Sequence, residues 1–173
     1  TFSSNINVTS ASMMSLADAF FPTMPEYARN MTLSGVISGA GSLNVAAPIG
    51  SAKSLIITNT GSTYSGTMTV TTDAIFAGTG NLPGAVVINN NADIAPGNGG
   101  AGKLTTGSLT LSDASKLIFE LAGSGDTTDD EVAVIEGLQR SLENQYAHAL
   151  DVRFWRPGGE KDLVEQIQCW TSK

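Results

Sequence analysis

The sequence holds one cysteine, Cys169, and one histidine, His148, among its 173 residues. One cysteine cannot form a disulfide within the chain, and a zinc site of cysteine and histidine ligands needs several such residues together. A Ser/His/Asp triad would have to use His148, and nothing around that residue resembles a nucleophile elbow. These shortages exclude a disulfide-stapled fold and a Cys/His metal site, and they argue against a serine hydrolase.

Charged side chains are also scarce, at 14% of the residues, against roughly 25% in an average soluble domain. Nine Lys and Arg against sixteen Asp and Glu give a net charge of −7. A nucleic-acid surface needs clustered Lys and Arg, so we expect no nucleic-acid partner. No apolar run approaches the roughly 18 residues of a transmembrane helix, so we expect no membrane span either.

The charges that are present are unevenly placed. Residues 1–119 contain four basic and five acidic residues, whereas residues 120–173 contain five basic and eleven acidic residues. Such a shift in composition marks a candidate boundary. The pattern predicts three segments: an N-terminal strand with an apolar cap or connector (1–30), a repeat region (31–123) and modified terminal coils (124–173).

The middle of the chain has a regular series of short apolar runs separated by Gly, Asn, Ser and Pro. Alternating apolar residues between such separators are typical of strands joined by turns. No helix-forming crossover lies between the runs. The runs predict strands at 31–38, 42–49, 54–60, 66–78, 84–95 and 107–121.

A spacing of about ten residues between strands fits a sandwich, a barrel or a solenoid. We favour an all-β solenoid, a right-handed parallel β-helix, because corners rich in Asn and Gly suit stacked coils and stacking buries an apolar face. An ordinary antiparallel sandwich is the alternative. The side chains expected to point inward are Leu33, Val36, Leu43, Leu55, Ile57, Val70, Ile75, Val86, Ile88, Leu109, Leu111 and Ile118.

Both ends depart from this pattern, as the capping ends of a solenoid do. Residues 1–10 fit one strand, and the stretch from Met13 to Phe21 has rough helical spacing before Pro22. In the C-terminal third, residues 137–149 fit either a short helix or a long loop between two strands, and we favour the helix because apolar residues recur there at helical spacing. Strands before and after that helix would complete a modified final coil.

The segment SLIITNTGSTYSGTMTV (54–70) resembles the autotransporter-associated β-strand repeat, in which a hydrophobic strand precedes N-x-Y-S-G-G-T and a second strand. The second Gly of that motif is missing, and Ser62 stands in place of Asn. Residues 32–45 and 82–123 resemble the flanking parts of the repeat. The resemblance implies a parallel β-helix in a secreted bacterial surface protein, and it brings no catalytic residue. The matching residues are Thr63, Tyr64, Ser65, Gly66 and Thr67.

The apolar N-terminal stretch is the candidate binding site. Its side chains would either fold back as a cap or dock onto the end of a neighbouring copy. We favour docking, because a head-to-tail contact that does not close generates a homopolymer. The candidate self-association residues are Met13, Met14, Leu16, Phe20 and Phe21.

Two groups of acidic residues are further candidate sites. The densest group lacks the spacing of a calcium-binding loop, so a solvated turn is the favoured interpretation. Three further acids lie twenty residues apart and would stack on successive coils, as a carbohydrate-active site or as a repeated turn position. The first group is Asp126, Asp129, Asp130 and Glu131, and the second is Asp73, Asp93 and Asp113.

Aromatic side chains in strand-like segments are a third candidate, because aromatic rings stack on sugars. A place in the core or at a capping end is the favoured interpretation for them. The residues concerned are Tyr64, Tyr146, Trp155 and Trp170.

These observations predict a non-enzymatic structural protein of the bacterial cell surface, without cofactor or metal. It would be the subunit of an extracellular fibre or the passenger of an adhesin, and we favour a complete, self-associating subunit. A host or matrix glycan is a second candidate partner. The alternative is a carbohydrate-active enzyme, a lyase or a glycosidase, on the same scaffold; acids clustered in one groove would favour it.

Overall fold

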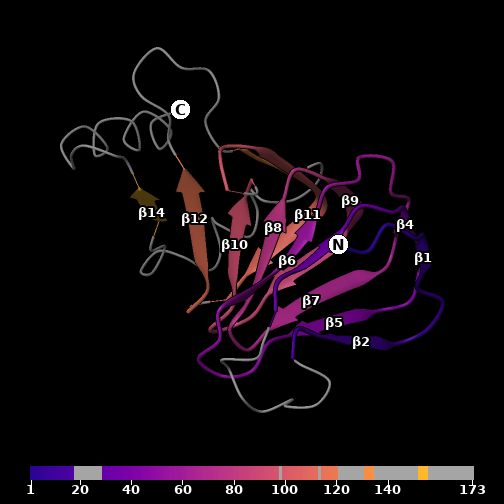
Figure 1. The fold of residues 1–173 in the computed structure, drawn as a ribbon, viewed down its shortest axis with the longest axis horizontal. Coiled ribbons are helices and arrows are strands. Elements are labelled where there is room, and N and C mark those ends of the chain that lie inside the picture. Colours follow the sequence, from indigo (N-terminus) through magenta and orange to yellow (C-terminus); the bar gives the residue numbers. More distant parts are fainter. Residues whose placement is uncertain (18–28, 98, 113, 121–130, 135–151, 156–173) are drawn as a thin grey trace.

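The computed structural model describes residues 1–17, 29–97, 99–112, 114–120, 131–134 and 152–155 (Figure 1). Every named element within these residues is a β-strand. No helix in this part of the chain is long and apolar enough to span a membrane.

The strands form three sheets in which all pairings are parallel, and strands that follow one another along most of the chain alternate between the two large sheets. The first six-stranded sheet, which we call the β2 sheet, has the order β13-β11-β9-β7-β5-β2. Its strands are β2 (Ser12–Ser15), β5 (Leu43–Ala46), β7 (Thr67–Thr71), β9 (Asn81–Ile88), β11 (Lys103–Leu111) and β13 (Glu131–Val134).

The second six-stranded sheet, which we call the β3 sheet, has the order β14-β12-β10-β8-β6-β3 and is also parallel throughout. Its strands are β3 (Met31–Leu33), β6 (Lys53–Ile57), β8 (Ala74–Gly78), β10 (Asp93–Pro96), β12 (Lys116–Glu120) and β14 (Val152–Trp155). A two-stranded sheet pairs β1 (Ile6–Asn7) with β4 (Ile37–Ser38).

This arrangement corrects the prediction of a single right-handed parallel β-helix with atypical capping ends. The fold is all-β and its strands are parallel, but the strands divide among three separate sheets. The cause lies at the corners, where a residue with positive φ turns the backbone sharply out of one sheet. Ala52 precedes β6, Asp73 precedes β8 and Asn91 lies between β9 and β10, with φ angles of 47°, 52° and 61°. The helix predicted over 137–149 lies outside the described residues.

The same corners divide the predicted strands. The predicted run 66–78 contains β7 and β8, with a turn at Thr72 and Asp73, and both residues have positive φ. The run 84–95 is likewise divided between β9 and β10. Asn and Asp tolerate the left-handed conformation better than most residues, which explains their place at these turns.

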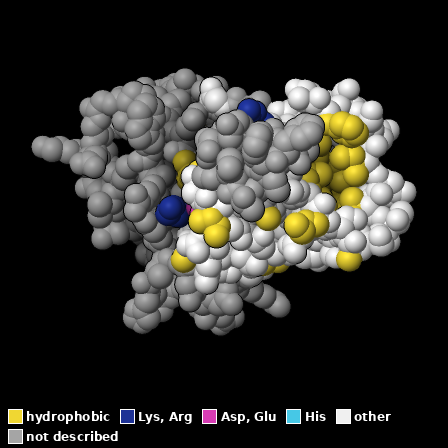
Figure 2. Space-filling view, turned by 60° about the horizontal axis from the view of Figure 1, so that its bottom comes forward, with side chains coloured by type: hydrophobic (Ala, Val, Ile, Leu, Met, Phe, Trp, Pro, Cys, Tyr) yellow, Lys and Arg dark blue, Asp and Glu magenta, His cyan; other side chains and the backbone are white. Residues whose placement is uncertain are grey.

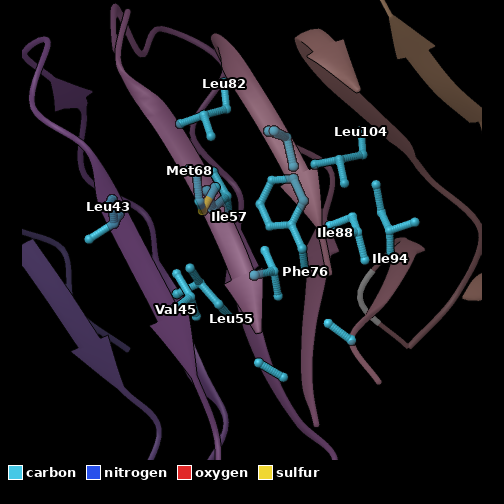
Figure 3. Close-up of a cluster of buried hydrophobic side chains, with 14 of the residues drawn as sticks. Leu43, Val45, Leu55, Ile57, Met68, Phe76, Leu82, Ile88, Ile94 and Leu104 are labelled. Atoms are coloured by element: carbon cyan, nitrogen blue, oxygen red, sulfur yellow. The ribbon is translucent and has the colours of Figure 1, made fainter. Parts of the chain in front are cut away.

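The core lies between the two large sheets and consists of aligned apolar columns (Figure 3). In the β2 sheet one column holds Leu43, Met68, Val86 and Leu109 in register. In the β3 sheet a second column holds Leu55, Phe76, Ile94 and Leu117. Full burial of a large apolar side chain contributes about 1.5–3 kcal/mol, so these columns are the main stabilising feature of the fold.

Nine of the twelve predicted core side chains are buried, and three are not. Val36, Ile75 and Ile118 are half-buried. Phe76 is the inward side chain of β8, and it is fully buried. The alternation of inward and outward residues in β7 continues without a shift through the turn into β8.

A column of closely packed glycines runs from the residue before β7 into the middle of β9 and β11. Gly66 lies one residue before β7, and a Cβ there would collide with the carbonyl oxygen of Gly41. Gly84 approaches the carbonyl oxygen of Gly66 in the same way, and Gly107 approaches the backbone of Pro83. The ring of Tyr64 fills the space beside Gly66 and Gly84, and its hydroxyl donates a hydrogen bond of 2.8 Å to the Gly41 carbonyl. Tyr64 is therefore a core residue, as favoured above, and only a residue without a side chain fits beneath it.

Candidate functional site

The β2 strand forms one edge of the β2 sheet. It pairs with β5 in parallel register, Met13 opposite Asn44 and Met14 opposite Val45, and it is the last strand in the order of that sheet. The backbone N–H of Ser12 donates to the carbonyl of Ser42, just before β5, and that of Leu16 donates to the carbonyl of Ala46 at the end of β5, each over 2.9 Å. In a parallel strand alternate N–H groups point to opposite sides, so those of Met13 and Ser15 point away from β5. Among the described residues no strand pairs with that outer side.

The structure separates the predicted self-association residues. Met13 is 72% exposed on β2, Met14 packs partly against the core, and Leu16 is buried. Phe20 and Phe21 lie outside the described residues. In the described part of this stretch the helical spacing is wrong, because β2 is an extended strand whose side chains alternate between solvent and core.

The outer face of the β2 sheet is mostly polar, and it carries a charged side chain, Lys103, where β11 begins. Met13, Asn44, Thr69, Val87 and Thr110 follow one another in register across it. The strands β2, β5, β7 and β9 contain no charged residue. Figure 2 shows a hydrophobic patch and scattered hydrophobic side chains on the face turned forward, mostly among uncharged atoms, with Lys or Arg side chains at the top and on the left. A neighbouring molecule would meet no charge repulsion from these four strands.

The described part of the chain is hollowed near this edge. A cavity of about 280 Å³ is lined by Phe2, Leu16, Arg29 and Met31, among others. Phe2 is 47% exposed, and it bridges to Leu33 at the start of the chain. The backbone N–H of Arg29 donates to the Leu16 carbonyl over 3.0 Å, which ties the end of the β2 segment to the start of β3.

A second hollow, of about 430 Å³, lies at the corner that precedes β8, β10 and β12. Ala52, Asp73 and Asn91 follow one another along this corner, and all three have positive φ. The Asp73 N–H donates to the Asn91 carbonyl over 2.7 Å. Successive turns of the chain, which we call rungs, are therefore still hydrogen-bonded to each other where the backbone leaves the sheet. The Gly50 N–H donates to Oδ2 of Asp73 over 2.6 Å, which fixes that carboxylate at the rim.

Asp93 and Lys116 line the same hollow from the first residues of β10 and β12, where they lie opposite each other in register. Burial raises the pKa of the Asp93 carboxyl, and the charge of Asp73 adds to the rise. The Lys116 ammonium and a hydrogen bond from the Lys116 backbone lower the pKa of Asp93 in part.

The prediction that acidic residues twenty positions apart stack on successive coils is wrong, because the strand register does not align them. Asp93 pairs with Ile75, so the residue that continues from Asp73 on the next rung is Asn91. The turn before β10 is shorter than a regular twenty-residue repeat would need. The carboxylates of Asp73 and Asp93 therefore face the same hollow but do not stack on each other. Asp113 lies outside the described residues.

Most of the remaining candidates lie outside the described residues: Asp126, Asp129, Asp130, Tyr146 and Trp170. Glu131 begins β13, in register with Lys103, and Trp155 ends β14. In the described part of the chain no three His, Cys, Asp or Glu side chains are grouped so that they could hold a metal ion.

The sequence did not single out Asn91, Ser115 or Lys116 as neighbours in a site. Asn91 falls inside the strand predicted over 84–95, and Lys116 falls inside the strand predicted over 107–121. The signal available was the positive-φ preference of Asn before an acidic residue, which marks a corner but not what faces it. Searches against family models, curated proteins and solved structures gave no match to this chain.

Proposed function

We propose that this chain is a non-enzymatic structural subunit of the bacterial cell surface, which joins other copies head to tail in an extracellular fibre or as part of an adhesin. The observation that supports this most is the outer edge of β2, which presents strand backbone and the exposed side chain of Met13 without any charge. An edge strand with these properties is a template for pairing with another chain.

The parallel sheets make the two ends of the molecule different. One end carries β2 and β3, and the last named strands at the other end are β13 and β14. A further parallel strand could extend either sheet only by joining unlike ends of two copies. Such a contact is heterologous and does not close on itself, so it leads to a filament.

The distribution of charge supports the same proposal. The net charge of −7 comes mainly from residues 120–173, which hold eleven of the sixteen acidic residues. That charge keeps free copies apart in solution, while the uncharged edge of β2 permits close contact. The extracellular location rests on the resemblance of residues 54–70 to a repeat of secreted surface proteins.

The test is a substitution at the edge. Met13→Lys places a charge on an exposed side chain of β2, and lysine on an edge strand opposes pairing. Light scattering should show that the mass of the wild-type protein rises with concentration, whereas the Met13→Lys variant stays monomeric. Electron microscopy of the concentrated wild-type protein should show filaments.

Ile49→Lys is the matched control, because Ile49 is 78% exposed but lies in a turn outside the sheet. This variant should assemble as the wild type does. A wild-type protein that is a strict monomer at high concentration overturns the proposal. Equal assembly of the wild type and Met13→Lys removes β2 as the connector.

A further inference from the structure

The corner hollow lies apart from the β2 edge and plays no part in the proposed assembly. It collects polar groups from three successive rungs: the carboxylates of Asp73 and Asp93, the side-chain amide of Asn91, the hydroxyl of Ser115 and the ammonium of Lys116. Its volume of about 430 Å³ is within the range of roughly 300–1,000 Å³ that is usual for small-molecule sites.

The charges in the hollow restrict what it can hold. Lys116 lies in register with Asp93 and its positive charge acts on that carboxylate, so the same charge opposes a bare metal cation in the hollow. Two carboxylates oppose an anionic ligand in the same way. The volume also exceeds many times the roughly 30 Å³ share of one water molecule, so a single ion would leave it largely unfilled.

The hydrogen-bonding groups point to a ligand with both donors and acceptors. Oδ2 of Asp73 is held by the Gly50 N–H, which orients the carboxylate and leaves Oδ1 to accept. The Ser115 hydroxyl donates to the Ser112 carbonyl over 2.7 Å, so its oxygen is left as an acceptor. Lys116 and the Asn91 amide supply donors. Adjacent hydroxyl groups on one ring offer donors to carboxylates and acceptors to an ammonium at the same time.

We propose that the corner hollow binds a neutral sugar ring or an equivalent polyol. Asp73 and Asp93 accept hydrogen bonds from the sugar hydroxyls, and Lys116 donates to a sugar oxygen. The hollow is partly open to water, so such binding would serve contact with a glycan.

Titration of the intact, isotope-labelled chain by NMR tests this proposal. The probes are the neutral methyl glucoside and methyl mannoside, with glucuronate and calcium chloride as charged comparisons. A neutral sugar should shift the backbone amide signals of Asp73, Asn91 and Lys116, whereas glucuronate and calcium should not. Asp93→Asn and Lys116→Gln should each weaken sugar binding roughly tenfold, because each removes a hydrogen bond to a charged group.

Lys53→Gln is the control, because Lys53 begins β6 on the side of the strand opposite to the Asp93 column. It should leave sugar binding unchanged. Lack of shifts with every neutral sugar, or equal shifts in the wild type and Asp93→Asn, overturns the proposal. Shifts with calcium alone would replace it with a cation site. The monomeric Met13→Lys variant should bind sugar as the wild type does, so this result is independent of assembly.

Discussion

Ile88 lies in an apolar column of the β2 sheet, in register with Val70 and Leu111, and it is fully buried. Replacing it by alanine leaves a cavity that the neighbouring strands cannot close. We expect Ile88→Ala to lower the free energy of unfolding by about 2–5 kcal/mol. Chemical denaturation followed by circular dichroism measures this change.

Ile49→Ala is the comparison for that experiment, since the side chain of Ile49 is largely in solvent. It should change the free energy of unfolding by less than about 0.5 kcal/mol. Equal effects of the two substitutions would contradict the assignment of Ile88 to the core.

The raised pKa of Asp93 predicts a dependence of stability on pH. The folded state holds the Asp93 proton more tightly than the unfolded state, whose carboxyl has a pKa of about 3.9. The stabilising contribution is therefore complete below about pH 3.9 and is lost as the pH rises through the higher pKa of the folded state. Asp93→Asn removes this contribution.

Denaturation curves recorded from acidic to neutral pH check that sign. The free energy of unfolding of the wild type should fall relative to that of Asp93→Asn as the pH rises from about 3.9. Other carboxyl groups titrate in both proteins, so their effects on the free energy of unfolding cancel in this comparison. A constant difference between the two proteins across this interval would show that Asp93 titrates normally.

The alternation of buried and exposed residues within one strand was predictable from the sequence. Which residues of the next strand point inward after a turn was not. Val70 and Ile88 follow the period-two pattern that any strand shows, and both are buried as expected. Ile75 was expected inward, whereas Phe76 is buried. Deciding between them requires the conformation of Thr72 and Asp73, two residues with positive φ that carry no glycine signal.

The division of long runs into two strands is the main feature that sequence patterns missed. β9 and β10 were predicted as one strand, because the asparagines between them are compatible with an extended chain. The hollow was missed for the same reason. Asp73 and Asp93 were expected on equivalent positions of successive rungs, and only the shorter turn at Asn91 places them across a cavity.

Strands in the middle of the β2 sheet should be the most resistant to opening. β7 and β9 are paired on both sides, whereas β2 is paired with β5 alone among the described strands. Local opening requires breaking fewer hydrogen bonds at an edge than in the centre. Hydrogen exchange of the monomeric Met13→Lys protein should therefore be slower in β7 and β9 than in β2.

Exchange measured by mass spectrometry on peptides from each strand distinguishes these cases. In assembled wild-type protein, exchange in β2 should slow toward that of β7, since a second copy would then cover the edge. Protection of β2 in the monomer equal to that of β7 would mean that another part of the chain already covers this edge.

The molecule as a whole should turn over no polysaccharide. In the corner hollow one carboxylate oxygen of Asp73 accepts the Gly50 N–H, and Lys116 lies opposite Asp93 in register, so we expect no proton transfer from either acid to a leaving group. Incubation with pectin, alginate and chitin should release no reducing ends. Turnover that is lost in Asp93→Ala would favour the alternative of a lyase or glycosidase.

The glycine column has a consequence for what can be added to this chain. Gly41, Gly66, Gly84 and Gly107 hold successive segments in close backbone contact along one column, yet they are unevenly spaced in the sequence. The turns elsewhere must therefore absorb differences in length. At Gly99 and Gly100 an added side chain would meet nothing within 4 Å. A foreign peptide inserted at this turn would be displayed on the outside, while the glycine column stays closed to any new side chain.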